Sequence, residues 1–179
     1  MGEIGEILVG NLSSLCAMIT DSLSGTRKKQ KQILLLQSLS QVFYMTSYIV
    51  LKGYSSAVQC FVGILRNFAA MWKIKSRVVE WTLVTMGVGL GLYFNNMGIL
   101  GWLPVVANLE YSLAVFRFKE NPRALKIAFL VNMIMYGIFN AIIINIVGTI
   151  SCVVVAATTF IFLVKERSQD SNSSISPET

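Results

Sequence analysis

The stretch ALKIAFLVNMIMYGIFNAIIINIVGTISCVVVAATTFIFLVKER, residues 124–167, decides the fold class of this chain. It carries no charged side chain from position 127 to position 164. About 20 apolar residues are enough for a helix to cross the ~30 Å hydrocarbon core of a bilayer. The stretch therefore predicts two membrane-spanning helices, 124–144 and 146–164, joined by a tight turn at Asn145.

The composition extends this prediction to the whole chain of 179 residues. Hydrophobic residues make up 54% and charged residues 13%, and the mean hydropathy is +0.63. Soluble domains carry about 25% charged residues, so a single buried core does not explain these values. In lipid every backbone polar group needs an internal partner, and long apolar runs satisfy this as helices. Five further runs precede the quoted stretch, at 4–23, 33–51, 56–72, 78–94 and 97–116.

The basic residues give the seven predicted spans a direction. Thirteen of the 15 basic residues follow spans one, three, five and seven. They are Arg27, Lys28, Lys29, Lys31, Lys73, Lys75, Arg77, Arg117, Lys119, Arg123, Lys126, Lys165 and Arg167. Lys52 alone lies on the other side, and Arg66 lies within a span. The positive-inside rule then places the N-terminus outside and the C-terminus in the cytoplasm, with residues 166–179 expected to be a disordered cytoplasmic tail.

The spacing of the basic segments predicts an internal repeat. Arg27 and Lys119 are 92 residues apart, as are Lys73 and Lys165. This predicts an all-α membrane protein in which two parallel three-helix units, 1–75 and 97–165, are joined by a linker helix at 76–96. The linker contains Gly87 and Gly91, whose small-xxx-small spacing favours close helix packing within the monomer or, alternatively, a homodimer contact.

Several short motifs resemble the YgjV-type bacterial inner-membrane proteins over most of the chain up to Lys165. They are Lys28-Lys29-Gln30, Leu65-Arg66, Leu103-Pro104-Val105, Phe116-Arg117, Tyr136, Asn140 and Gly148-Thr149. The resemblance implies relation to the SWEET, PQ-loop and PnuC-like proteins, and hence a three-plus-one-plus-three fold, a bacterial inner-membrane location and a transport role. Carriers of the SWEET type use prolines as hinges in several helices, whereas here only Pro104 lies within a predicted span.

Arg66 is the residue most informative about function. A charge near the middle of a span costs at least ~2.5 kcal/mol, so it should face the interior and have a partner. Glu110 lies at a comparable depth in span five, and we expect the two to pair. Either Arg66 binds an anionic substrate group, because its planar fork suits a carboxylate or phosphate, or the pair is structural.

Amide and tyrosine side chains lie at similar depths in the predicted spans. The amides are Asn11, Gln37, Gln41, Gln59, Asn67, Asn108, Asn132 and Asn140, and together they favour a polar site between the two units. Tyr44, Tyr48 and Tyr136 could stack against a ring or simply pack. We predict that the substrate-binding residues are Arg66, Asn67, Asn108, Glu110, Tyr136 and Asn140, with Pro104 as a hinge or a harmless kink.

The sequence argues against several other classes of protein. It contains no histidine, its three cysteines lack metal spacing, and no phosphate-binding motif appears, so no enzyme activity, metal or cofactor is expected. The net charge of +6 is explained by topology rather than nucleic acid. Two functions remain, a carrier or facilitator of a small polar solute and a non-transporting membrane scaffold. The expected partners are the lipid bilayer, a small-molecule substrate and a second copy of the chain.

Overall fold

The computed structural model describes residues 3–25, 30–72, 74, 76–117 and 122–173. These residues form seven α-helices and one 3-10 turn, and no strand occurs among them. The elements are α1 (Glu3–Gly25), α2 (Gln30–Val50), α3 (Tyr54–Met71), α4 (Arg77–Tyr93), η1 (Gly98–Gly101), α5 (Trp102–Arg117), α6 (Pro122–Ile142) and α7 (Ile146–Ser173). The all-helical prediction is thus confirmed.

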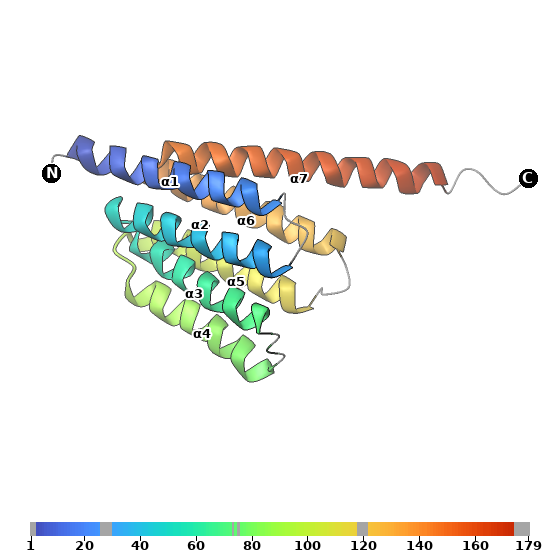
Figure 1. Cartoon of the computed structure of the whole chain (residues 1–179), viewed down its shortest axis with the longest axis horizontal. Coiled ribbons are helices and arrows are strands. Elements are labelled where there is room, and N and C mark those ends of the chain that lie inside the picture. The colour runs from blue at the N-terminus through green and yellow to red at the C-terminus, as the bar shows by residue number, and fades with distance from the viewer. Residues whose placement is uncertain (1–2, 26–29, 73, 75, 118–121, 174–179) are drawn as a thin grey trace, which may run out of the picture.

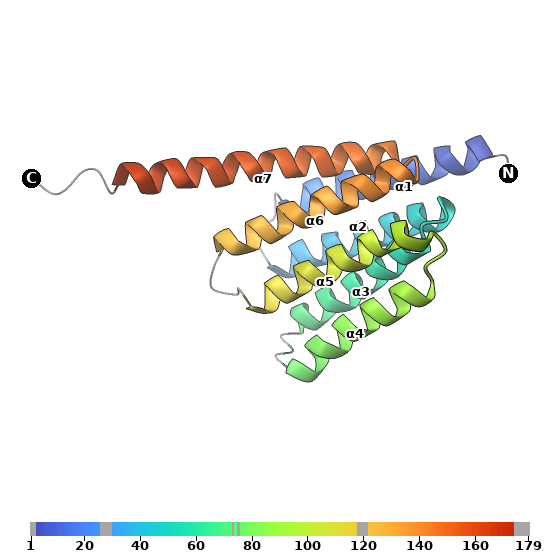
Figure 2. The same ribbon diagram turned by 180° about the vertical axis from the view of Figure 1, so that it is seen from behind.

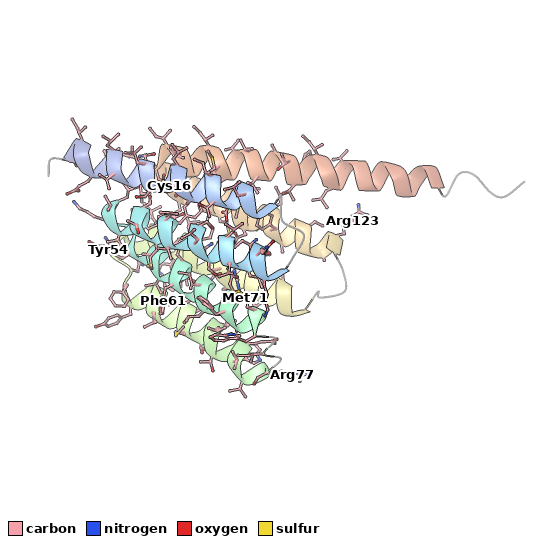
Figure 3. The ribbon with its side chains drawn as sticks, in the orientation of Figure 1. Cys16, Tyr54, Phe61, Met71, Arg77 and Arg123 are labelled. Carbon is pink, nitrogen blue, oxygen red and sulfur yellow. The ribbon has the colours of Figure 1, made fainter. Side chains whose placement is uncertain are left out.

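The helices run up and down along one common direction (Figures 1 and 2). The helices α1, α3 and α5 end at one end of the bundle, and α7 passes the same end and continues beyond it. We call this the basic end, because the exposed side chains of Lys31, Arg77 and Arg123 lie there; Figure 3 labels the last two. We call the opposite end, where the short α2–α3 and α6–α7 turns lie, the turn end.

Six of the helices form a closed ring in chain order. Helix α1 packs against α2, and α2 packs against α3. In the same way α5 packs against α6, and α6 packs against α7. Contacts of α1 with α7 and of α3 with α5 close the ring. The remaining helix, α4, packs on the outside of the ring against α3 and α5. The ring therefore surrounds a central space to which α4 has no direct access.

The bundle has an apolar exterior, and its interior contains many polar side chains beside apolar ones. The most deeply buried polar side chains include Ser14, Ser40, Ser47, Asn140 and Asn145, each at most 1% exposed. The outer faces of the helices carry leucine, isoleucine and valine, for example Leu8, Leu12, Leu35, Ile134, Ile138, Val153 and Val154, each at least half exposed. Soluble proteins show the opposite distribution, whereas polar groups of membrane helices face the bundle interior.

Length and apolar composition alone single out fewer helices. Among the described residues, one segment, Glu3–Asp21 of α1, is long and apolar enough to cross a membrane by these criteria, and Ile127–Ile142 and Ile146–Ile161 are shorter apolar segments. Interior polar residues such as Gln59, Arg66 and Asn67 lower the hydropathy of α3. The number of spans therefore remains a prediction.

The α2–α3 turn and the α6–α7 turn have the same backbone geometry at a constant offset of 92 residues. Lys52 and Ile144 both adopt a left-handed conformation, with φ of 59° and 58°, which is uncommon for residues other than glycine. The backbone hydrogen bonds correspond one to one. Donor and acceptor are Leu51–Ser47, Lys52–Ile49, Gly53–Tyr48 and Ala57–Gly53 in the first turn, and Ile143–Phe139, Ile144–Ala141, Asn145–Asn140 and Thr149–Asn145 in the second.

Contacts between these two turns come in pairs that are related by the same offset of 92 residues. Asn145 Nδ2 donates to Ser47 Oγ at 3.4 Å. The residues 92 positions from this pair are Gly53 and Phe139, and they also meet, because a β-carbon on Gly53 would lie 3.2 Å from the Phe139 ring. The same offset relates the contact of α1 with α7 to the contact of α5 with α3. The two sets of three helices therefore dock through matched surfaces at the turn end.

Asn145 also caps the N-terminus of α7. Its Oδ1 accepts the N–H of Gly148 at 3.0 Å, which is the N-cap bond to the third helical residue. Asn11 of α1 holds the same turn from outside, since its Oδ1 accepts the N–H of Val147 and its Nδ2 donates to the carbonyl of Ile144. The expected tight turn at Asn145 is confirmed and is tied to α1.

Two predicted boundaries differ from the structure. The segment predicted to start a helix at position 97 begins with the 3-10 turn Gly98–Gly101, so Pro104 lies in the first turn of α5. A proline there leaves no internal hydrogen bond unmade, and the expected disruption of a helix interior does not occur; its role as a hinge stays a prediction. The tail 166–179, expected to be disordered, is helical as far as Ser173, because no glycine or proline interrupts the chain there.

Candidate functional site

A cavity of about 360 Å³ lies at the centre of the helix ring. This volume is within the usual range of small-molecule sites, roughly 300–1,000 Å³. Its walls come from α1, α2, α3, α5, α6 and α7, and no described residue of α4 lines it. The residues are Asp21, Gln37, Gln41, Tyr44, Tyr48, Gln59, Cys60, Gly63, Arg66, Asn67, Asn108, Tyr111, Phe129, Asn132, Met133, Tyr136, Asn140, Ser151, Cys152 and Val155.

Most of the lining positions are matched across the two sets of helices. Seven pairs of lining residues are separated by 92 positions. They are Gln37 and Phe129, Gln41 and Met133, Tyr44 and Tyr136, Tyr48 and Asn140, Gln59 and Ser151, Cys60 and Cys152, and Gly63 and Val155. Positions 92 residues apart on α2 and α6, and on α3 and α7, therefore line one central space.

The chemistry of these matched positions is unequal. Gln37 and Gln41 on α2 correspond to Phe129 and Met133 on α6. Arg66 and Asn67 correspond to Thr158 and Thr159, which do not line the cavity and donate instead to backbone carbonyls of their own helix. The wall formed by α2 and α3 is thus the more polar one, and the facing wall of α6 is partly apolar.

Arg66 lines this cavity and has no carboxylate partner among the described residues. Its Nη1 makes a long hydrogen bond of 3.5 Å to Ser112 Oγ, and its Cζ lies 5.6 Å from the centre of the Tyr111 ring. Within the described ranges no acidic side chain forms an ion pair with it. A guanidinium has five N–H donors, and the bond to Ser112 engages one of them within the described part of the chain.

The predicted pair of Arg66 with Glu110 is wrong. Glu110 does not line the cavity, and it shares one stripe of α5 with the exposed Val106 and Leu113. Its Oε2 atom is buried without a hydrogen-bond partner in the described part of the chain. Residues two apart on a helix point in different directions, and Asn108 occupies the cavity face that Glu110 would need.

Several lining amides are already held by hydrogen bonds between helices. Asn108 Nδ2 donates to Gln59 Oε1 at 2.6 Å, and Gln59 Nε2 donates to the Gly87 carbonyl at 2.8 Å. Asn132 Nδ2 donates to the Ala107 carbonyl, and Asn140 accepts from Asn145. These residues shape the cavity and fix the neighbouring helices.

Three other amides remain available to a ligand. Gln37, Gln41 and Asn67 make no side-chain hydrogen bond to any residue that the structure describes. Gln41 lies beside Gly63, since a β-carbon there would be 3.5 Å from its Oε1. Gly63, Arg66 and Asn67 share one face of α3, so the free amides and the guanidinium surround the same part of the cavity.

The glycine stripe of α4 packs inside the monomer. A β-carbon on Gly87 would lie 3.3 Å from Gln59 Oε1, and one on Gly91 would collide with Gln59 Nε2 and Val105. The predicted packing role of both glycines thus has its partner within the chain. In the structure Gln59 of α3 and Val105 of α5 lie against this stripe, and the alternative of a homodimer contact stays a prediction.

The cavity brings together five of the six predicted site residues and adds others. Arg66, Asn67, Asn108, Tyr136 and Asn140 line it. Sequence reasoning passed over Tyr111, Phe129 and Met133, although their positions relative to lining residues on the same helices could have indicated them. Asp21 is not among the predicted site residues. In the structure Asp21 lines the cavity and accepts a hydrogen bond from Ser40, and the loop residues 26–29 lie outside the described residues.

A helix bundle with an apolar exterior and a central cavity lined by both polar and apolar side chains belongs to the class of helical membrane proteins. Residues 8–169 match the family model Imp-YgjV, described as bacterial inner membrane protein. The chain therefore belongs to this family, and the resemblance expected from the short motifs is confirmed. No curated protein and no solved structure matches the chain.

Proposed function

We propose that this inner-membrane protein is a carrier or facilitator of a small polar solute that binds in the central cavity. The observation that carries the proposal is Arg66, a cavity-lining cation without a carboxylate partner among the described residues. An uncompensated charge at membrane depth is costly, and such residues mark substrate or ion pathways. A solute with an anionic group would complete the hydrogen bonding of this side chain.

The proposed architecture is two parallel three-helix units, α1–α3 and α5–α7, joined by α4. It is supported by the matched turns, the paired contacts and the seven pairs of lining positions, all at an offset of 92 residues. A single crossing by α4 gives both units the same orientation. Binding sites in repeat transporters lie at the interface between the repeats, which is where this cavity lies.

The proposed orientation places the basic end in the cytoplasm and the N-terminus outside. Lys31, Arg77 and Arg123 are exposed at that end, and the turn end has Lys52, which pairs with Glu6 at 3.3 Å. Basic loops favour the cytoplasmic side of a membrane. The bilayer is then the principal partner, and the basic end would meet its anionic headgroups.

Thermal unfolding of the purified protein in detergent, with a panel of metabolites, tests the proposal. A ligand present at 100 times its Kd should stabilise the protein by about 2.7 kcal/mol. A stabilising compound should also enter liposomes that contain the protein faster than liposomes that do not. Stabilisation without entry would refute the carrier function, and the absence of any stabilising compound would favour the alternative, a membrane scaffold.

A further inference from the structure

The two walls of the cavity differ in chemistry, and this difference constrains the ligand. This inference rests on the proposed function, because it concerns the solute that occupies the same cavity. Among the described lining residues, Asp21 and Arg66 are the only ones with an Asp, Glu, Lys or Arg side chain. Asp21 lies on α1 and is acidic, whereas Arg66 lies on α3 and is basic. The charge that can attract an anion therefore comes from a single guanidinium.

The polar part of the cavity is built around Arg66. Asn67 follows it on α3, and Gln41 of α2 lies across Gly63, one helical turn earlier. Arginine presents its donors in a planar fork that matches the two oxygens of a carboxylate. The free amide groups of Asn67 and Gln41 could add further donors to those oxygens. Gly63 leaves this region open, whereas its counterpart on α7 is Val155.

An aromatic wall begins directly beside the guanidinium. Arg66 Cζ lies 5.6 Å from the centre of the Tyr111 ring, and the Tyr111 and Phe129 rings are 5.7 Å apart. Met133, one turn after Phe129 on α6, continues this wall. Aromatic and methionine side chains make favourable contacts with flat rings. An apolar ring attached to the anionic group would therefore meet these side chains.

From this arrangement we propose that the cavity binds an aromatic monocarboxylate, with its carboxylate on Arg66 and its ring against Phe129 and Met133. One guanidinium neutralises one negative charge. Asp21, which lines the same cavity, adds no positive charge for a second anionic group. A small inorganic dianion would also leave the Phe129 and Met133 wall without a contact.

Binding of benzoate, benzamide, acetate and inorganic phosphate to the full-length protein in detergent tests this assignment. We expect benzoate to bind at least about tenfold more tightly than benzamide, which keeps the ring but lacks the charge. Acetate, which keeps the charge but lacks the ring, should be weaker than benzoate by a similar factor. Equal affinity for benzoate and benzamide, or a preference for phosphate, would overturn the assignment.

Variants separate the two parts of the proposed site. Arg66→Gln should abolish the preference for benzoate over benzamide, while Arg77→Gln, which changes an exposed arginine outside the cavity, should preserve it. Phe129→Ala should weaken benzoate and leave acetate unchanged. If Arg66→Gln does not fold, Arg66→Lys keeps the charge without the planar fork and should reduce the benzoate preference. A preference that persists in these Arg66 variants refutes the role of the guanidinium.

Failure of this assignment can be told apart from failure of the proposed function. If other metabolites stabilise the protein and cross the membrane while benzoate does not bind, the cavity is a carrier site for another ligand class. If no compound of a broad panel binds at all, the carrier proposal fails together with the ligand assignment. Binding of benzoate that is lost in both Arg66→Gln and Phe129→Ala supports both.

Discussion

Replacing Gly91 by alanine tests the close packing of α4 against the ring. A β-carbon at this position would collide with Gln59 Nε2 and would lie 2.8 Å from Val105 Cγ2. Gln59 cannot move freely, because it donates to the Gly87 carbonyl and accepts from Asn108. Gly89 on the same helix is the matched control, since a β-carbon there meets nothing within 4 Å.

The expected change in the free energy of unfolding combines three contributions, of which one stabilises the protein and two destabilise it. Alanine instead of glycine in a helix gains roughly 0.5–1 kcal/mol in both variants. At Gly91 the added methyl group costs about 1–3 kcal/mol by overpacking. Loss of the bond from Gln59 to the Gly87 carbonyl adds about 0.5–1.5 kcal/mol. Gly91→Ala should therefore lower the free energy of unfolding by about 0.5–4 kcal/mol, whereas Gly89→Ala should leave it unchanged or raise it.

Thermal unfolding in detergent measures this difference. For a chain of this size 1 kcal/mol corresponds to about 2–4 °C in Tm. Gly91→Ala should thus unfold several degrees below the unmodified protein, and Gly89→Ala at or slightly above it. If the two variants had equal Tm values, α4 would not pack on α3 through this stripe. The same result would favour the glycine face as a surface for a second copy of the chain.

Two further substitutions follow from the structure. Asn145→Ala removes the cap of α7 and the bonds to Ser47 and Asn140, so it should destabilise the protein by about 1–2 kcal/mol or more, measured as a lower Tm; an unchanged Tm would contradict the capping role. Glu110→Gln removes a carboxylate that has no partner in the described chain and does not line the cavity. It should keep the Tm and any ligand affinity, and a loss of binding would show that Glu110 takes part in the site.

The composition and the spacing of basic residues predicted the helices and their offset, because both follow from the energetics of burial in lipid. The offset of 92 between Lys73 and Lys165 reappears in the turns of the structure, at Lys52 and Ile144. Residues 166–179 were predicted to be disordered, but α7 continues to Ser173, because a polar sequence without glycine or proline can continue a helix; residues 174–179 lie outside the described residues.

The candidate site was predicted from the depth of each residue in the membrane. Depth does not say in which direction around the helix axis a side chain points. Asn108 and Glu110 have nearly the same depth, but only Asn108 has the rotation that faces the cavity. Rotation could be judged from the apolar stripe of Val106 and Leu113, which marks the outward face. The bonds of Gln59 to α4 and α5 could not be predicted, since they depend on how three helices come together.

The proposed joining of two three-helix units in one chain has a consequence for the charge of the cavity. If the same site were made by two identical copies of a three-helix protein, every side chain would occur twice, and two guanidinium groups would face each other across a narrow space. Their mutual repulsion and the doubled cost of burial would work against folding. A single polypeptide avoids this, because position 66 can be arginine while its counterpart, position 158, is threonine. The covalent link thus permits a single arginine in the central cavity. Two identical subunits would each contribute one.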